Sequence, residues 1–250
     1  MRFFGEATGT GDVTSLPGAT AIFCGLNYGV FNIALLDKPV ERGWRQPGFE
    51  DRLSAVSAYF KDKKANWSFW LCEDFLDTAA QKRARQMLNQ AGLRPISYPP
   101  GMLAPTLAPP KRPLPTIELR PVNDAELRQA FSDITSLCFE IPVAISHRVY
   151  TPARAWNGAY QGFVGFANGR PISIVATVTS AGVIGIYSLG THPDYRGQGY
   201  GEATMRAAVA ITALKTGLER VVLQSTEAGY PLYRRMGFRD ATRFTVYLTK

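Results

Sequence analysis

The chain has 250 residues, of which 46% are apolar and 19% charged, and its net charge is +8. This composition is typical of a soluble globular protein with room for two domains, and no apolar stretch is long enough to span a membrane. The three cysteines form no Cys-x-x-Cys pair and only two histidines accompany them, which favours neither a disulfide framework nor a zinc site. A metal is therefore not expected.

The N-terminal sequence indicates the cellular location, and the distribution of charge indicates the kind of partner. Met1–Val13 carries acidic residues and glycines where an export signal needs an apolar core, so the sequence favours a cytoplasmic location and no membrane association. The positive excess is +4 in residues 1–116 and +4 in residues 117–250, and the densest cluster is a group of lysines at 61–64. This even distribution disfavours nucleic acid as a partner, although acylation of a charged tRNA or of a nucleic-acid-bound protein stays open. Nothing in the sequence indicates an oligomeric state.

The first half of the chain predicts strands and helices in alternation. Its apolar patterns change between a period of two and a period near four residues, and Gly92 is placed to end a helix. The predicted elements are strand-like pieces within Ala19–Leu36, a helix at Arg52–Lys61, a buried strand at Trp67–Leu71 and a helix at Ala79–Ala91.

A proline-rich segment separates the two halves. Pro99–Pro115 contains seven prolines, which can neither continue a helix nor pair inside a sheet, so it predicts an extended connector. The alternating strand Thr116–Val122 follows it directly. We therefore expect two domains, residues 1–112 as an accessory α/β domain and residues 113–250 as the domain that carries the chemistry.

The second half predicts an α+β domain. Asp124 or the preceding Asn123 can cap a helix that runs to about Phe139, and Asn168-Gly169 is a strong two-residue hairpin turn. The other predicted elements are strands at Gln161–Asn168, Pro171–Ser180, Val183–Thr191, Arg220–Gln224 and Arg243–Leu248, a helix at Gly199–Thr216 that Gly217 ends, and a short helix at Pro231–Met236.

The glycine-rich turn between the strand Val183–Thr191 and the helix Gly199–Thr216 carries the chemical signal. Glycines at 197, 199 and 201 remove side chains around the helix start, where the first N–H groups have no internal partner and the helix dipole is positive. An anion such as a diphosphate can bind there, with Arg196 beside it. Gly201 is followed by Glu-Ala rather than Lys-Ser/Thr, and the spacing is GxGxG rather than GxGxxG, which disfavours Mg–ATP and dinucleotide loops.

Two motifs resemble the GNAT (GCN5-related N-acetyltransferase) family. Arg196-Gly-Gln-Gly-Tyr-Gly201 resembles its R/Q-x-x-G-x-G/A diphosphate loop, and Gly229-Tyr-Pro-Leu-Tyr-Arg-Arg-Met-Gly-Phe238 resembles its LYxxxGF helix. The order of elements between Ile117 and Leu248 is also similar. The resemblance implies a GNAT fold, a mixed and mostly antiparallel sheet flanked by helices. Weaker similarities, the Trp-Ser-Phe-Trp strand and Pro100-Gly-Met102, imply that the first half is a degenerate copy of the same fold.

The resemblance also implies the ligand and the roles of individual residues. Acetyl-CoA is the implied cosubstrate, and an amine attacks its thioester directly, which requires orientation and an oxyanion donor but no covalent enzyme intermediate. The backbone N–H of Leu189 would face the thioester oxygen, Gly190 and Thr191 would pair with pantetheine, and Tyr233 would protonate the departing thiolate. The diphosphate would contact Arg196, Gly197, Gln198, Gly199, Tyr200 and Gly201.

The general base and the acceptor are left open. The strand before the loop has no acidic residue, so Glu140, Tyr187 or an ordered water are the candidates, and His147 and His192 fit surface or capping roles better. An acceptor pocket is expected between the segment Phe139–Tyr160 and the facing strand around Tyr187, and a contribution from the first half stays open. Within that segment an apolar rim, or simply core, is suggested by Phe139, Ile141, Pro142, Tyr150 and Trp156.

The leading hypothesis is an N-acetyltransferase that acetylates a primary amine on a small molecule or a protein. A non-catalytic acyl-CoA-binding regulatory module is the alternative, since the usual acidic base is missing. The first half, which has only the isolated Gly25-Leu-Asn-Tyr-Gly29, is expected to be structural or to control substrate access.

Overall fold

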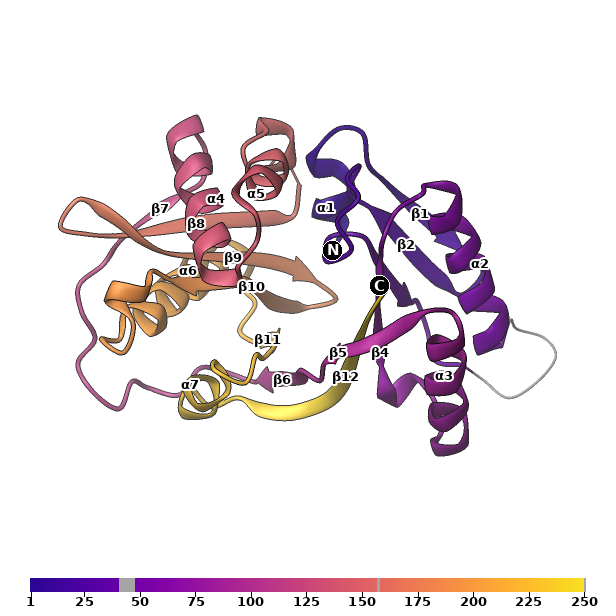
Figure 1. The fold of residues 1–250 in the computed structure, drawn as a ribbon. Helices are drawn as coiled ribbons and strands as arrows, with labels where there is room; N and C mark the ends of the chain where they lie inside the picture. Colours follow the sequence, from indigo (N-terminus) through magenta and orange to yellow (C-terminus); the bar gives the residue numbers. More distant parts are fainter. Residues whose placement is uncertain (41–47, 157, 250) are drawn as a thin grey trace. The chain divides into compact units, whose positions relative to one another are not determined.

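The computed structural model describes residues 1–40, 48–156 and 158–249, which divide into two compact units (Figure 1). The first unit contains Met1–Pro100 together with Thr242–Lys250, and the second contains Gly101–Ala241. Both are α+β, as the sequence predicts, with mostly antiparallel strands flanked by helices. Each unit is described by itself below.

The first unit combines a three-stranded antiparallel meander with a parallel strand. β1, β2 and β3 pair antiparallel in that order, β4 runs parallel to β3, and β12 (Arg239–Thr249) pairs antiparallel with both β4 and β5. The remaining elements in chain order are α1 (Arg2–Ala7), β1 (Asp12–Leu16), β2 (Ala19–Phe23), β3 (Ile33–Leu36), α2 (Phe49–Asp62), β4 (Ser68–Cys72), a 3-10 turn (Glu73–Phe75), α3 (Thr78–Gln90) and β5 (Leu93–Ser97).

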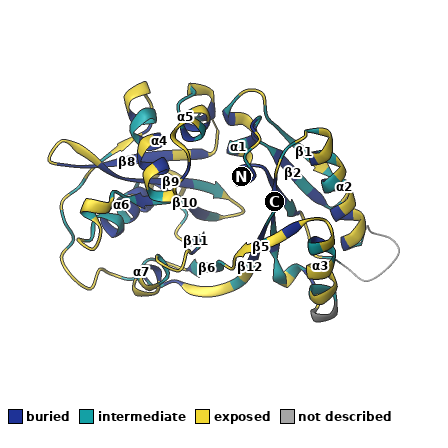
Figure 2. Cartoon of the chain, viewed as in Figure 1, coloured by how far each residue is buried: buried dark blue, intermediate teal, exposed yellow. Residues whose placement is uncertain are grey.

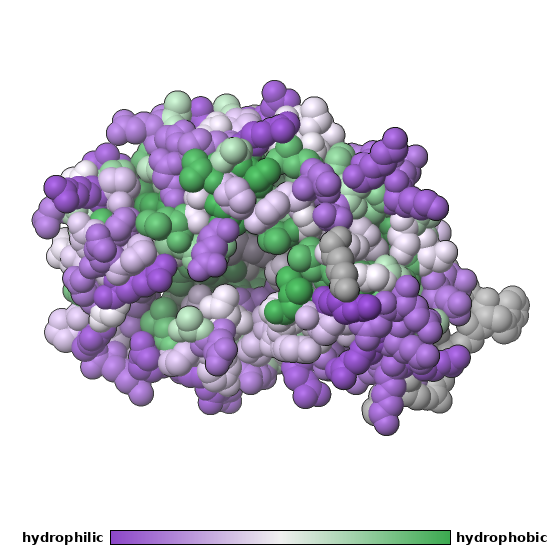
Figure 3. All heavy atoms as spheres, viewed as in Figure 1, coloured by the Kyte–Doolittle hydropathy of each residue, from purple (hydrophilic) through white to green (hydrophobic). Residues whose placement is uncertain are grey.

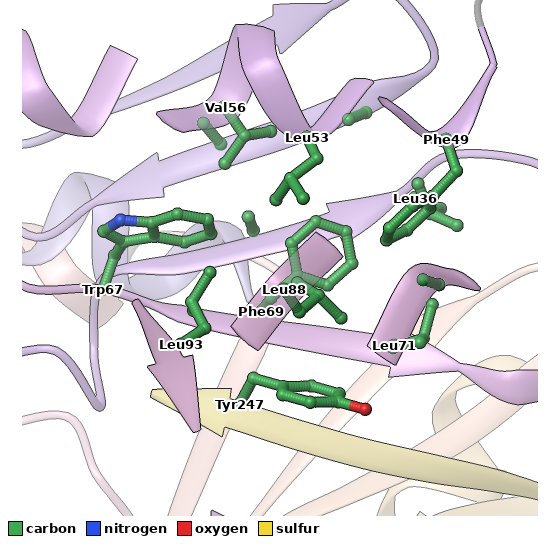
Figure 4. Close-up of a cluster of buried hydrophobic side chains, with 14 of the residues drawn as sticks. Leu36, Phe49, Leu53, Val56, Trp67, Phe69, Leu71, Leu88, Leu93 and Tyr247 are labelled. Carbon is green, nitrogen blue, oxygen red and sulfur yellow. The ribbon is translucent and has the colours of Figure 1, made fainter. Parts of the chain in front are cut away.

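Helix α2 shows why the first unit folds as the sequence predicts. Leu53, Val56 and Phe60 recur on one helical face and are all buried in the core of the unit. Figure 4 shows Leu53 and Val56 within this core. The Phe60 ring stacks on Trp67 with a centroid distance of 5.0 Å. Tyr247 of β12 belongs to the same core, so the last strand of the chain supplies a core side chain to the first unit.

The second unit has a sheet with the order β7-β8-β9-β10-β11-β6, in which only the β10–β11 pair is parallel. Figure 2 shows its strands β8 and β9 as mainly buried, with exposed residues on the outer faces of the helices. Its elements in chain order are β6 (Pro100–Ala104), β7 (Glu118–Pro121), α4 (Ala125–Phe139), α5 (Val143–Tyr150), a 3-10 turn (Ala153–Trp156), β8 (Tyr160–Ala167), β9 (Arg170–Ser180), β10 (Val183–Thr191), a 3-10 turn (Pro193–Tyr195), α6 (Tyr200–Thr216), β11 (Val221–Gln224) and α7 (Tyr230–Arg235).

Caps and turns confirm the local predictions for the second unit. The Asp124 carboxylate accepts a 2.8 Å hydrogen bond from the N–H of Leu127 and begins α4. Asn168 and Gly169 have φ of 51° and 73°, which joins β8 to β9 by a tight hairpin. Gly217 is left-handed and ends α6.

The same order of elements occurs in both units. β1-β2-β3-α2-β4-α3 in the first corresponds to β8-β9-β10-α6-β11-α7 in the second, and in each the strand before the long helix is parallel to the strand after it. An antiparallel strand then completes each sheet, β12 beside β4 and β6 beside β11. The chain is therefore a tandem of one fold, in which each copy pairs with the final strand of the other.

Two expectations about strands were wrong. Pro99–Pro115 was predicted as a connector without pairing, but Pro100–Ala104 forms β6, because its proline occupies the first strand position and Met102 and Ala104 are buried. Arg243–Leu248 was predicted to close the sheet of the second half, but it pairs with β4 and β5. The compact units therefore do not coincide with the predicted domains, since residues 101–112 belong to the second unit and residues 242–250 to the first. The assignment of functions to residues 1–112 and 113–250 stays a prediction.

The described residues add two observations on environment. None of their helices has the length and apolar character that crossing a bilayer requires, and no group of three metal-ligating side chains occurs among them. Hydrophilic side chains predominate on the face shown in Figure 3. Lys63 of the lysine cluster forms a 2.8 Å ion pair with Asp12, so part of this positive charge is already neutralised.

Candidate active site

Strand β10 contains a β-bulge at the position where the catalytic backbone was predicted. The register with β9 passes from Tyr187 opposite Ala176 directly to Gly190 opposite Ile174, so Ser188 and Leu189 together face one residue. Ser188 has a φ of 49°, a left-handed conformation that is uncommon for serine. Such a bulge rotates the strand locally and gives the N–H of Leu189 a direction that a regular ladder would not.

A buried tyrosine holds this bulge in place. The hydroxyl groups of Tyr160 and Ser188 lie 2.8 Å apart, and Tyr160 is buried beside Tyr150. Burial raises the pKa of the Tyr160 phenol well above its ordinary value, so this phenol stays neutral. Neither residue was predicted as part of the site, because a non-glycine residue with positive φ leaves no sequence signal.

β10 and β11 pair over a short length only. Ile184 lies opposite Val221 and Gly185 opposite Val222, and no further pair connects these two strands in the part of the chain that the structure describes. Gly190 and Thr191 at the end of β10 therefore have no β11 residue opposite them, and the Thr191 carbonyl oxygen instead accepts from Arg196 Nε and Cys138 Sγ. An extended chain of amides can pair with a strand edge of this kind.

The glycine loop, residues 196–201, is accessible. Arg196, Gly197 and Gln198 are exposed, and the residues from Gly199 to Gly201 are half-buried. Gly199 has a φ of 94° and precedes the first residue of α6, and no described side chain caps the helix start. The first amides of α6 thus have no protein acceptor among the described residues and can bind an anion.

Side chains around the glycine loop fix its backbone by donating to carbonyl oxygens. These acceptors are neutral, so the positive charges of the arginines are not cancelled by them. Arg196 donates from Nε to the Thr191 carbonyl oxygen at 3.0 Å, and Gln198 donates to the Asp194 carbonyl at 3.0 Å. Arg112, from the connector before β7, donates to the Gly197 carbonyl at 3.2 Å. Arg112 was not predicted, since nothing in the sequence indicates that the connector returns to this loop.

Glu202 in the first turn of α6 could repel an anion, but its charge is paired. Two nitrogens of Arg206 donate to Glu202 Oε1, at 2.9 and 2.7 Å, and both side chains are largely buried, with 10% of Glu202 and 17% of Arg206 exposed. An ion pair at this i,i+4 spacing removes most of the local negative potential.

Tyr233 and Leu189 pack into the same core. Tyr233 is 8% exposed and packs edge to face on Phe238, and Leu189 lies against the same cluster of side chains. Burial raises the pKa of the Tyr233 phenol from 10 to about 12. The phenol is thus fully protonated at neutral pH and can donate a proton or a hydrogen bond.

The candidates for the general base and for the acceptor pocket differ in how far they are buried. Tyr187 on β10 is half-buried, and Glu140 is exposed at the left-handed end of α4. Two residues before Glu140, the Cys138 thiol donates to the Thr191 carbonyl at 3.3 Å, which places this end of α4 beside β10. Within the predicted rim, Phe139 and Pro142 are exposed and Trp156 is half-buried, whereas Ile141 and Tyr150 are buried core.

The histidines have the surface roles that were expected. His147 lies 2.7 Å from Asp133 on the surface formed by α4 and α5. His192 accepts a weak 3.4 Å hydrogen bond from the N–H of Asp194 and so begins the turn before the glycine loop. Neither contact indicates a part in proton transfer.

The first unit differs at the corresponding helix start. Gly25–Gly29 lies between β2 and β3 rather than before a helix. The first turn of α2, the counterpart of α6, contains Glu50 and Asp51, and the Asp51 carboxylate accepts from the N–H of Gly48 at 2.9 Å. These acids would repel a phosphate, since they lie where the helix dipole would otherwise attract one.

Solved structures share this fold over nearly the whole chain. A GCN5-related N-acetyltransferase from Kribbella flavida superposes with a TM-score of 0.69 at 18% identity, covering 95% of this chain and 88% of that one. One from Sphaerobacter thermophilus gives 0.59 at 17% identity, covering 93% and 76%. A tandem GNAT protein from the clavulanic acid biosynthesis pathway gives 0.56 at 12% identity, covering 92% and 78%. No curated protein sequence matches the chain.

These structural similarities place the chain among proteins with two GNAT folds in tandem. The sequence model described as the acetyltransferase (GNAT) family then matches residues 125–238, which include β10, the glycine loop, α6 and α7. Residues 125–238 accordingly match the GNAT family model within a GNAT fold, and the first unit repeats the same order of elements.

Proposed function

We propose that the protein is an acetyl-CoA-dependent N-acetyltransferase that acetylates a primary amine on a small molecule or a protein. The observation that carries the proposal is the accessible glycine loop, residues 196–201, which leads into the uncapped start of α6 and follows the bulged strand β10. The first feature suits a diphosphate, and the second suits an acyl group beside the strand.

The coenzyme would be held by backbone groups more than by side chains. The amides of Gly197, Gly199 and Gly201 and their neighbours Gln198 and Tyr200 would bind the diphosphate, with Arg196 adding a full positive charge. Gly190 and Thr191 would pair with the pantetheine amides, an assignment supported by the end of β10, which has no β11 residue opposite it. Both sets of contacts orient the thioester before reaction.

The reacting atoms would meet at Leu189 and Tyr233. The amine nitrogen attacks the thioester carbon, a C–N bond forms, and the C–S bond breaks with its electron pair leaving on sulfur. The Leu189 N–H donates to the carbonyl oxygen as it gains negative charge, and the Tyr233 hydroxyl donates toward the sulfur. The nitrogen loses its extra proton to solvent water or to Glu140, because burial raises the pKa of Tyr187 and keeps that phenol protonated.

The raised pKa of Tyr233 is compatible with this role. A phenol with a pKa of about 12 is a weaker acid than a thiol in water, whose pKa is about 8.5. The same burial that raises the phenol pKa also raises the pKa of a thiolate released beside it, so the two values shift in the same direction. Tyr233 would therefore stabilise the leaving sulfur mainly by a hydrogen bond that strengthens as charge develops.

An acyl-CoA-binding module without turnover is the second candidate, and the absence of any acidic residue from β10 favours it. The two candidates differ in one measurement. Purified protein is incubated with acetyl-CoA and a panel of primary amines and amine-bearing peptides, and free thiol and acetylated product are both quantified. The enzyme hypothesis expects equal amounts of the two with at least one amine. Acetyl-CoA binding without thiol release for any amine would favour the binding module.

A further inference from the structure

A basic cavity of about 290 Å³ opens in the second unit beside the glycine loop. It is lined by Lys111 and Arg112 of the connector, Glu202 of the first turn of α6, and Arg235 at the end of α7. Glu202 lies one residue after Gly201, so the basic cavity adjoins the proposed diphosphate site. No predicted site residue lines it.

The charges in the basic cavity are unbalanced. Its one carboxylate, Glu202, is already paired with Arg206. No described carboxylate forms an ion pair with Lys111, Arg112 or Arg235, and the two arginines bond only to the carbonyl oxygens of Gly197 and Pro231 among the described residues. Three cations that converge on one cavity without an anionic partner repel one another, and an anion would relieve this repulsion.

The connector is held at two points, which keeps its cations near the loop. The N–H of Ala108 donates to the Met236 carbonyl at 2.9 Å, directly after α7. Further along, Arg112 bonds to Gly197, and a Cβ placed on Gly199 would lie 3.1 Å from Pro115 Cδ. Prolines between these points restrict the backbone. The basic side chains are thus presented by a stiff segment rather than by a freely moving one.

We propose that the basic cavity binds the 3′-phosphate of coenzyme A, an inference that rests on the proposed function. Coenzyme A carries two anionic groups a few bonds apart, a diphosphate and a phosphomonoester on the ribose. With the diphosphate at the start of α6, the ribose phosphate has to lie nearby, and a phosphomonoester carries close to two negative charges at neutral pH. Arg235, Lys111 and Arg112 match that charge, and the cavity has room for the group.

The experiment compares acetyl-CoA with acetyl-3′-dephospho-CoA on the full chain. Calorimetric dissociation constants are measured at fixed salt for the unmodified protein, Arg235→Gln and Lys111→Gln. The unmodified protein is expected to bind acetyl-CoA about 10- to 100-fold more tightly than the dephospho compound, as lost charge-assisted hydrogen bonds would give. Each variant is expected to lose most of that ratio, by weakening acetyl-CoA only.

Arg234→Gln is the matched control, because it removes the same charge from the same short helix but does not line the cavity. It should keep the full ratio. Equal binding of the two compounds by the unmodified protein would overturn the inference while leaving coenzyme binding intact. Equal weakening of both compounds in the cavity variants would also overturn it, since that result indicates general electrostatic attraction. Binding of neither compound by the unmodified protein would reject the proposed function itself.

Discussion

The phenol of Tyr233 has one chemical property that its ring packing does not explain. Ring burial against Phe238 would be served equally by phenylalanine, whereas the hydroxyl has no hydrogen-bond partner among the described residues. The hydroxyl is not among the fully buried, unpartnered groups of the described residues, so its oxygen keeps access to solvent and can reach a ligand. Its retention fits a group that acts on a ligand.

Tyr233→Phe tests this role. We expect kcat to fall about 100-fold, the lower part of the range for loss of a general acid, while the dissociation constant for acetyl-CoA stays unchanged. Stopped-flow thiol release gives the rate and calorimetry gives the binding. Tyr230→Phe is the control, since this tyrosine lies on the same helix and bonds to Asp240. Equal losses in the two variants, or no loss in Tyr233→Phe, would contradict the assignment.

Single site residues can be predicted from the sequence where they belong to a local motif. Glycines at a helix start and a tyrosine in the LYxxxGF segment are recognisable because few other residues suit those places. Ser188 and Tyr160 are not, because their importance arises from a bulge and a hydrogen bond between residues far apart in the chain. Arg112 was missed for the same reason.

Among the elements, α6 is the one on which coenzyme binding depends. It begins and ends with a left-handed glycine, Gly199 with φ 94° and Gly217 with φ 70°. The two positions have similar backbone requirements, but only Gly199 lies in the glycine loop. They therefore form a matched pair for separating stability from ligand binding.

We expect Gly199→Ala and Gly217→Ala each to lower the free energy of unfolding by about 1 kcal/mol, since alanine is strained at positive φ. Only Gly199→Ala should weaken acetyl-CoA binding, by about 10-fold or more, because its Cβ would lie 3.1 Å from Pro115 Cδ and shift the glycine loop that carries the helix-start amides. Urea unfolding and calorimetry measure the two effects. If both variants bind acetyl-CoA like the unmodified protein, the diphosphate does not use this helix start.

Elements with a local signal were predicted well. The apolar stripe of α2 and the Asp124 cap of α4 both follow from neighbouring residues. Strand partners did not follow, because nothing in the sequences of β6 and β12 specifies which sheet each joins. Only the tertiary structure determines that β6 completes one unit and β12 the other. Helix α5 was left undefined because Ile141-Pro142 interrupts the pattern before it.

For the molecule as a whole, buried phenols predict a limit to alkaline stability. Burial raises the pKa of seven tyrosines above the ordinary value of 10, distributed over both units, namely Tyr28, Tyr59, Tyr150, Tyr160, Tyr187, Tyr233 and Tyr247. In the unfolded chain these groups ionise near pH 10. Folded stability that depends on neutral phenols is thus fully present below pH 10 and is lost as the pH rises above it.

The free energy of unfolding should therefore decrease with rising pH above 10. Tyr233 alone would account for about 3 kcal/mol between pH 10 and 12, from its shift to a pKa of about 12. Urea titrations at several pH values measure the slope, and Tyr233→Phe should make it shallower whereas Tyr230→Phe should not. A slope that Tyr233→Phe leaves unchanged would mean that this phenol ionises normally in the folded protein.

The reciprocal strands predict which fragment can fold alone. Residues 113–250 match the domain that the sequence suggests, but they lack β6, whose Met102 and Ala104 are fully buried beside β11. Residues 101–241 keep β6 from Gly101 onward and omit β12 after Ala241, the part that belongs to the other unit. Removal of a buried methionine side chain alone costs about 2–5 kcal/mol, a large part of the 5–15 kcal/mol typical of a whole domain.

We therefore expect the 101–241 fragment to unfold cooperatively in urea and to bind acetyl-CoA, and the 113–250 fragment to be much less stable or insoluble. Comparison of their urea midpoints and acetyl-CoA affinities is the measurement. If 113–250 were equally stable, β12 would have to replace β6 beside β11, which its position directly after α7 allows. That result would mean that the exchange of final strands between the copies arises from their covalent connection rather than from a preference of either strand for its sheet.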